Sequence, residues 1–182
     1  VDQLSQHHRE YAREMVKGIF DRQDDIAFDL DKHHDEAVAL GVKCAKSNKT
    51  SYNPVQIRCI KAAQDIGLAL IARGHYHDAI LVVVPLCNIT MGYLKSKAAI
   101  AFAEALIEAD QIEYALRIAR MVSLLKGNAK AMTAKTIALE LVWHGAIKEA
   151  EQIVADLQQH TGEYAKNSAQ EVVMAIETAQ QK

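Results

Sequence analysis

The sequence has few residues that interrupt an α-helix. Only two prolines and eight glycines occur in 182 residues, and residues that favour helices, such as Ala, Leu, Ile, Glu, Lys and Gln, are abundant. No segment reaches the roughly 20 consecutive apolar residues that a membrane-spanning helix needs. The longest apolar run, residues 79–87, is less than half that length and contains Pro85. The sequence therefore predicts an all-α protein that does not enter a membrane.

An excess of charge of one sign is also missing. The chain has 21 Lys and Arg against 23 Asp and Glu, which gives a formal net charge of −2. It therefore has no basic excess with which to neutralise a phosphate backbone. Nucleic acid is not an expected partner.

Cysteine is scarce too. The three cysteines, Cys44, Cys59 and Cys87, have no C-x-x-C spacing and lie among apolar neighbours. We interpret them as buried hydrophobic residues in a reducing compartment, with a redox or nucleophilic role as the alternative. The first eight residues are polar and lack the apolar stretch of a signal peptide. Both observations favour a cytoplasmic location.

Residues 1–50 are expected to form an irregular N-terminal helical region. Apolar residues recur every three or four positions in residues 11–20, as in an amphipathic helix. The segment His33-His34-Asp35-Glu36-Ala37 is similar to the turns of the repeats described next, so this region is interpreted as including a decayed repeat. Polar turn formers in residues 47–54 separate it from the rest, and Pro54 suits the first position of the following helix.

Residues 54–160 contain three similar units. The first reads Ala63-x-x-Ile66-Gly67-x-x-Leu70-x-x-x-Gly74-x-Tyr76-x-x-Ala79. The matching positions are Ala99, Phe102, Ala103, Leu106, Asp110, Ile112 and Ala115 in the second unit, and Ala134, Ile137, Ala138, Leu141, Gly145, Ile147 and Ala150 in the third. The turn residues Gly74, Asp110 and Gly145 are 36 and 35 residues apart. A period of this length indicates an array of helical hairpins.

The shared positions have physical causes. A small residue such as Gly67 lets two helices approach closely, and Ala79 and its equivalents occupy the matching tight point on the second helix. Glycine at the turn adopts the left-handed conformation that ends a helix, for which Asp110 is a less favourable substitute. One hairpin cannot bury its apolar face alone, so neighbouring hairpins must stack. Residues 162–181, with one apolar stripe, are expected to form a C-terminal capping helix.

The first unit resembles a tetratricopeptide repeat. The run Ile66-Gly67-x-x-Leu70-x-x-x-Gly74-His75-Tyr76-x-x-Ala79 carries the paired glycines, the aromatic residue and the alanine of that family at the right spacing. The other two units are similar but lack the aromatics, and no unit has the usual closing proline, which is replaced by Met91, Gly127 and Gly162. The resemblance implies a right-handed superhelical stack of antiparallel helical hairpins whose first helices line a concave groove.

The resemblance also implies the residues of a partner-binding groove on the second and third units. We expect an apolar groove with lysines at its edge and the single tryptophan as its anchor. The candidates are Lys97, Ile100, Glu104, Ile107, Lys135, Leu139, Val142 and Trp143. The basic clamp with which some members of the family hold chaperone C-termini is absent, because its places hold Gln64, Leu68, Ala101, Met132 and Thr136.

An exposed apolar groove needs something to cover it. The expected partner is a helix or peptide of another protein, and the alternatives are a second copy of the chain in a homodimer or its own N-terminal helices. The acidic residues between Glu104 and Glu113 are interpreted as a solvated helix face. No Gly-x-Ser-x-Gly, phosphate-binding loop or G-x-G-x-x-G motif occurs. The prediction is therefore a non-enzymatic protein-interaction module, such as an adaptor, chaperone or regulator, without a cofactor.

Histidines support an alternative interpretation. His7-His8-Arg9-Glu10 and His33-His34-Asp35-Glu36 share one pattern, and His75-x-His77 follows later. Facing segments of this kind can bind a metal ion in a helical bundle. However, adjacent histidines on a helix point about 100° apart, and the His-x-x-Glu order is the reverse of the usual one. We therefore predict no metal site, and the alternative is a small helical metal-binding protein or enzyme that uses this His-rich N-terminal segment.

Overall fold

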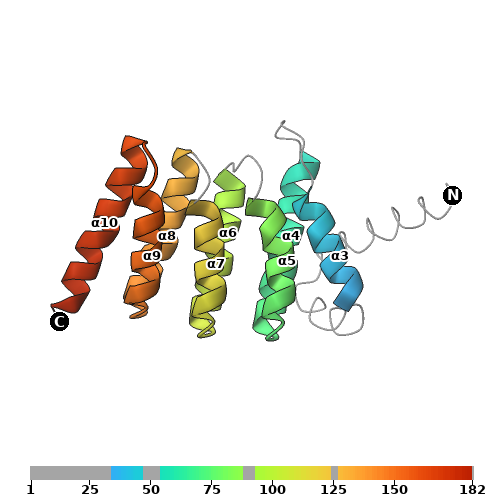
Figure 1. The fold of residues 1–182 in the computed structure, drawn as a ribbon. Helices are drawn as coiled ribbons and strands as arrows, with labels where there is room; N and C mark the ends of the chain where they lie inside the picture. Colours follow the sequence, from blue (N-terminus) through green and yellow to red (C-terminus); the bar gives the residue numbers. More distant parts are fainter. Residues whose placement is uncertain (1–33, 47–53, 88–92, 124–126, 182) are drawn as a thin grey trace, which may run out of the picture.

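In the computed structural model, the described residues are 34–46, 54–87, 93–123 and 127–181 (Figure 1). Within these ranges the protein is entirely helical and contains no strand. Its helices are α3 (His34–Ala45), α4 (Pro54–Ala72), α5 (Tyr76–Cys87), α6 (Tyr93–Glu108), α7 (Ile112–Ser123), α8 (Asn128–Trp143), α9 (Ile147–Gln158) and α10 (Glu163–Gln180). The predicted all-α class is confirmed for this part of the chain. None of these helices is both long enough and apolar enough to cross a lipid bilayer.

The helices lie side by side in chain order (Figure 1). Each helix packs on the next helix in the chain and on the one after that. For example, α3 packs on α4 and α5, and α8 packs on α9 and α10. Two rows result, an even row of α4, α6, α8 and α10 and an odd row of α3, α5, α7 and α9. Because the extensive contacts are between helices one or two places apart, each hairpin is stabilised mainly by its immediate neighbours.

Three helices of the even row end in the same hydrogen-bonded turn. After α4, Gly74 has a φ of 79°, its N–H donates to Ile71 O at 2.9 Å, and the His75 N–H donates to Leu70 O at 2.9 Å. The same two bonds follow α6 and α8, around Asp110 at φ 58° and Gly145 at φ 78°. This pattern is the Schellman motif, which satisfies the last carbonyls of a helix. The left-handed turn residues predicted from the sequence are confirmed at all three positions.

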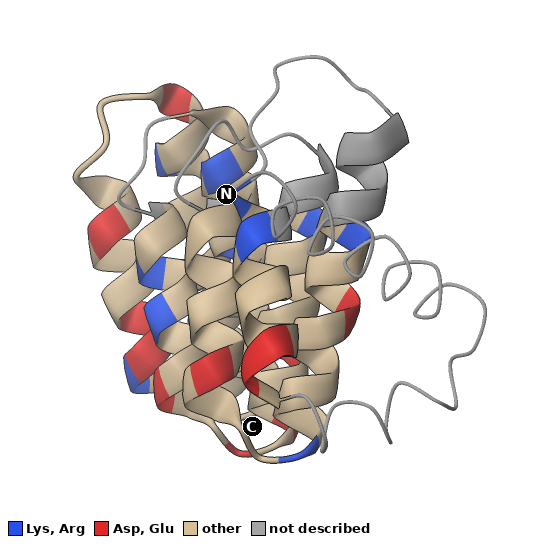
Figure 2. Ribbon diagram, turned by 90° about the vertical axis from the view of Figure 1, so that its right-hand side faces the viewer, with Lys and Arg blue, Asp and Glu red and all other residues tan. Residues whose placement is uncertain are grey.

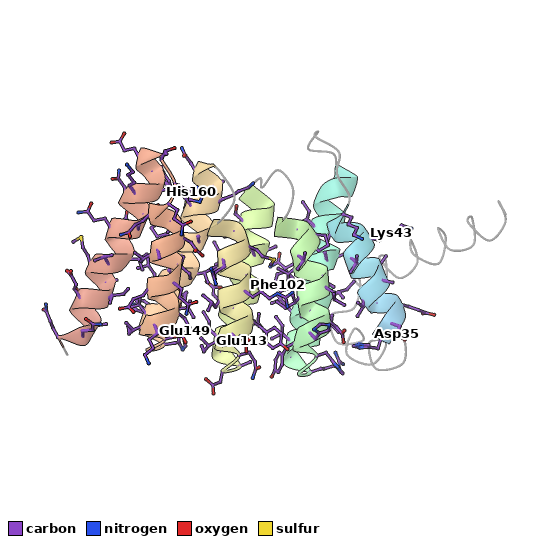
Figure 3. All side chains as sticks on the ribbon, in the orientation of Figure 1. Asp35, Lys43, Phe102, Glu113, Glu149 and His160 are labelled. Atoms are coloured by element: carbon purple, nitrogen blue, oxygen red, sulfur yellow. The ribbon has the colours of Figure 1, made fainter. Side chains whose placement is uncertain are left out.

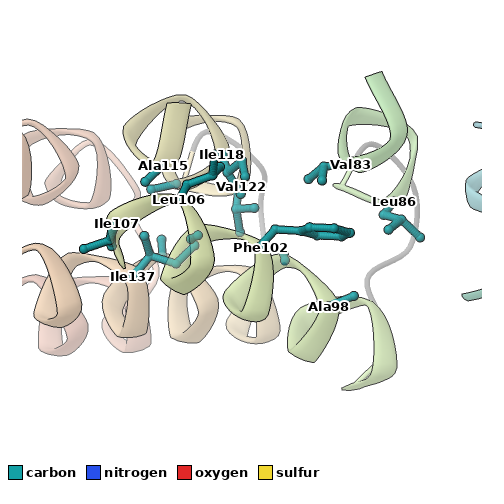
Figure 4. Packing of buried hydrophobic residues seen from close by; sticks show 14 of the residues in the cluster. Val83, Leu86, Ala98, Phe102, Leu106, Ile107, Ala115, Ile118, Val122 and Ile137 are labelled. Carbon is teal, nitrogen blue, oxygen red and sulfur yellow. The ribbon is translucent and has the colours of Figure 1, made fainter. Parts of the chain in front are cut away.

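The hydrophobic core lies between the two rows (Figure 4). Ala79, Ala115 and Ala150, the predicted tight points of the odd row, are all 0% exposed. In the even row, α4 and α6 meet at Gly67, where an added Cβ would lie 2.2 Å from Cε1 of Phe102. The predicted close approach at Gly67 is therefore confirmed, because the buried aromatic ring occupies the space that a side chain there would need.

Helix α3 packs as the second helix of a hairpin would. It lies in the odd row against α4 and α5, and its Ala37 is buried like Ala79 of α5. A Cβ added at Gly41 would lie 2.9 Å from Cγ2 of Val82, so the small residue brings α3 close to α5. This packing supports the interpretation of a decayed repeat. The rest of the predicted N-terminal region, residues 1–33, and the linker 47–53 lie outside the described residues.

Candidate functional site

The candidate binding residues lie on α6 and α8, two helices of the even row that pack against each other. Their exposure divides them into three groups. Lys97 and Trp143 are exposed, Ile100, Glu104, Lys135 and Leu139 are partly buried, and Ile107 and Val142 are buried. We use the name α6–α8 face for the accessible surface of these two helices, which is formed by Lys97, Ile100, Glu104, Glu108, Met132, Leu139, Glu140 and Trp143.

Ile107 and Val142 belong to the hydrophobic core. Their side chains are only 3% and 5% exposed, and each directly follows a fully buried leucine. One further residue along a helix turns the side chain by about 100°, which brings it against a neighbouring helix and not into solvent. Figure 4 shows Ile107 beside Ile137 of α8. Neither residue is accessible to a partner, so six of the eight candidates remain.

Trp143 is the most exposed large hydrophobic side chain among the described residues. It is the last residue of α8, and 85% of its surface is open. Met132, at 39% exposed, and the partly buried Leu139 precede it by 11 and 4 residues, so all three lie on one side of α8. An apolar stripe that ends in an open indole is unusual on a surface that contacts only water, and aromatic residues of this kind dominate protein interfaces.

Carboxylates lie beside this stripe. Glu104 and Glu108 are one turn apart on α6, and Glu140 lies on α8 between Leu139 and Leu141. Burial raises the pKa of Glu104 above its ordinary value, and the negative charges of Glu140 and Glu108 raise it further. The acidic run interpreted as a solvated face is thus partly buried at Glu104. Glu140 was not predicted from the sequence, although it follows Leu139, the residue that matches Glu104 in the repeat register.

The raised pKa of Glu104 predicts a pH-dependent gain in stability when its charge is removed. A folded-state pKa above the ordinary 4.5 means that the folded state binds this proton more tightly than the unfolded state does. The resulting stabilisation is present below the ordinary pKa and is lost as the pH rises through the folded-state pKa. Glu104→Gln should therefore raise the Tm at pH 7 by about 1–2 °C, a small effect because solvent screens the charge.

Differential scanning calorimetry at neutral pH and near pH 4 measures this effect. The difference in Tm between Glu104→Gln and the wild type should shrink at the lower pH. Glu151→Gln, an exposed position on α9, is the matched control and should show no gain. A lower Tm of Glu104→Gln at pH 7 would contradict the proposed repulsion on the α6–α8 face.

Acidic and basic residues are separated along α6 and α8. Lys97 lies in the first half of α6, whereas Glu108 ends it and Glu140 lies in the last turn of α8. Figure 2, in which the hairpin turns lie at the bottom, shows Asp and Glu mainly in the lower half of the helices and Lys and Arg mainly above them. Acidic residues near a helix C-terminus oppose the helix dipole, so this distribution does not stabilise α6 and α8 themselves.

Lys135 was predicted to lie at the open edge of a groove, but its side chain is mostly buried in an ion pair. Its Nζ lies 2.7 Å from Oε2 of Glu171 on α10, and only 19% of its side chain is exposed. The ion pair therefore connects α8 to the C-terminal helix.

The described part of the chain brings one group of histidines together. His34, His75 and Asp78 form a cluster whose possible ligand atoms lie within 4.8 Å of one another, while the neighbouring His77 is exposed and outside it. The other predicted histidines, His7, His8 and His33, lie outside the described residues.

The fold and this surface define a helical-hairpin array with an apolar and acidic face on its even row. No family model matches the chain, and comparisons with curated proteins and with solved structures found no match.

Proposed function

We propose that the chain is a tetratricopeptide-type interaction module whose α6–α8 face binds a segment of another protein. The proposal includes the right-handed superhelical arrangement of that family. It is supported by three identical Schellman turns at a period of 36 and 35 residues and by the regular packing of each helix on the next two. Binding to a protein requires no catalytic group, in keeping with the missing catalytic motifs.

The observation that carries the proposal is the exposure of Trp143. Leaving an indole 85% open forgoes roughly 1.5–3 kcal/mol of hydrophobic stabilisation that burial would provide. The α8 stripe of Met132, Leu139 and Trp143 therefore gains most when a partner covers it. In interfaces, a central aromatic residue surrounded by aliphatic ones commonly contributes about 2 kcal/mol or more to binding.

The charges of the face specify the chemistry of the partner. The carboxylates of Glu140 and Glu108 repel that of Glu104 beside the apolar stripe. A Lys or Arg side chain of the partner would relieve this repulsion and would also be favoured by the C-terminal ends of α6 and α8. The partner we propose is thus a helix or extended peptide that combines apolar side chains with at least one basic one.

A display selection tests this proposal without a known partner. Peptides that bind the whole 182-residue chain are selected from a random library, and the affinity of each enriched peptide is then measured for single-residue variants of the chain. We expect sequences that combine apolar residues with Lys or Arg. Their affinity should fall about 30-fold or more in Trp143→Ala, which corresponds to a loss of about 2 kcal/mol.

Two variants make the outcome specific to the α6–α8 face. Leu139→Glu places a charge in the apolar stripe and should abolish binding, whereas Leu81→Glu changes an exposed leucine on α5 of the odd row and should leave it intact. Enriched peptides that are acidic, or that bind Trp143→Ala and Leu139→Glu as well as the wild type, would contradict the proposal. Concentration-dependent self-association lost in Trp143→Ala would instead identify a second copy as the occupant.

A cytoplasmic location belongs to the same proposal. It is supported by the three cysteines, which have no spacing typical of a disulfide framework.

A further inference from the structure

Three polar side chains from separate segments meet where α3 contacts the α4–α5 hairpin. His34 is the first residue of α3, His75 lies in the turn after α4, and Asp78 is in the first turn of α5. Nε2 of His34 lies 2.9 Å from Oδ2 of Asp78, and the imidazole rings of His34 and His75 have centroids 4.5 Å apart. Figure 3 labels Asp35, which directly follows His34 at this end of α3.

The backbone holds these residues in place. The N–H of His75 donates to Leu70 O at 2.9 Å, and its carbonyl oxygen accepts the Ala79 N–H at 3.0 Å. Ala79 is fully buried one residue after Asp78, and Ala37 is buried three residues after His34. The buried Ala37 and Ala79 thus hold the backbone near His34 and Asp78 against the core. The side chains of His34 and Asp78 are 27% and 30% exposed, which leaves the cluster half-buried but open to an ion from solvent.

We propose that His34, His75 and Asp78 bind a divalent transition-metal ion of the Zn²⁺ class. Two imidazole nitrogens and one carboxylate oxygen form a donor set that suits Zn²⁺, and three protein ligands leave a fourth tetrahedral position for water. With metal–ligand distances of about 2.0–2.1 Å, ligand atoms in such a site lie about 3.3 Å apart. The atoms of this cluster, all within 4.8 Å of one another, reach that spacing by small side-chain rotations.

Two local features favour the ion. Asp35 and Glu36 follow His34 in the first turn of α3, so the surroundings of the cluster are acidic. The exposed ring of His75 can turn toward the ion without disturbing the core. Because the three ligands come from α3, the turn and α5, a bound ion clamps the N-terminal helix of the described array onto the α4–α5 hairpin. This role is independent of the α6–α8 face.

The alternative is that His34 and Asp78 form only a hydrogen-bonded ion pair between α3 and α5. The whole 182-residue chain is freed of metal with a chelator and titrated with Zn²⁺ alone by calorimetry, and Co²⁺ replaces Zn²⁺ for visible absorption. We expect saturable binding of one ion at the cluster, the intense Co²⁺ bands of a tetrahedral site and a rise in Tm with Zn²⁺ that a chelator reverses.

Variants separate a metal site from an ion pair. His75→Ala removes a ligand outside the His34–Asp78 pair, and Asp78→Asn keeps an acceptor for His34 while removing the carboxylate charge. Each should weaken Zn²⁺ binding at least about tenfold and abolish the Co²⁺ bands, whereas His77→Ala, in the same segment, should change neither. Circular dichroism checks that each variant is folded. No saturable binding, or Zn²⁺ binding that is equal in the wild type, His75→Ala and Asp78→Asn, would overturn the proposal.

Discussion

Replacing Phe102 with alanine is expected to lower the free energy of unfolding by about 3–5 kcal/mol. Phe102 is 0% exposed, and its ring packs on α4 at Gly67 and lies close to Val83 and Leu86 of α5 (Figure 4). Removing it leaves a cavity bordered by three helices whose hydrogen-bonded backbones restrict collapse. Urea unfolding followed by circular dichroism measures the change, and Tyr164→Ala, an exposed aromatic on α10, should stay within about 0.5 kcal/mol of the wild type.

A double-mutant cycle tests whether the ring and Gly67 are coupled as described. Gly67→Ala alone should be destabilising, because its new methyl group would lie 2.2 Å from Cε1 of Phe102. In the Phe102→Ala background the ring is gone, and the same change should have little effect. Additive effects of the two substitutions, or a loss below about 1 kcal/mol for Phe102→Ala, would contradict the described packing of α4 on α6.

Replacing Ala150 with leucine is expected to destabilise the protein by about 1–3 kcal/mol. Ala150 lies in α9 and is 0% exposed, and α9 contacts α7, α8 and α10. The added carbon atoms have no free space at this crossing, so they force the helices apart or the side chain out of its preferred rotamers. Thermal and urea unfolding of the variant measure the effect.

Gln152→Leu is the matched control for Ala150→Leu. It introduces the same side chain two residues further along α9, at an exposed position, and should change stability by no more than about 0.5 kcal/mol. Ala115→Leu, at the equivalent buried place in α7, should behave like Ala150→Leu. If all three variants unfold alike, the register in which the repeats are aligned is wrong.

The hairpins were predictable from the sequence because the signals for helix ends and tight crossings are local. Gly74 and Gly145 have the left-handed conformation expected of them, and even Asp110 adopts it because its place in the repeat fixes the turn. Residues 82–84 are three consecutive valines, which favour strands, yet they lie in α5, where burial between neighbouring helices outweighs that preference.

The exposure of individual side chains was harder to predict. The aligned repeats placed Ile107 and Val142 in the binding groove, yet both side chains are buried in the core. The partial burial of Glu104 depends on how closely α8 approaches α6, which the spacing of residues within α6 does not show.

The histidine cluster illustrates the same limit. The sequence showed His34 in one His-rich segment and His75 in another, 41 residues later, and it gave no reason to pair them. Their contact arises because α3 occupies the odd row next to α5, which places the N-terminus of α3 beside the turn that precedes α5. Asp78 carries one usable signal, its position in the first turn of α5, three residues after His75.

The fluorescence of Trp143 in the free protein tests most directly whether the α6–α8 face is open for a partner. Trp143 is the only tryptophan in the chain, so its emission can be excited selectively. We predict the red-shifted emission of a hydrated indole, readily quenched by iodide, and a blue shift with protection from iodide when a selected peptide binds. A blue-shifted emission in the free protein that resists iodide, and that reddens only when residues 1–33 are deleted, would contradict this account, because the chain itself would then cover the face.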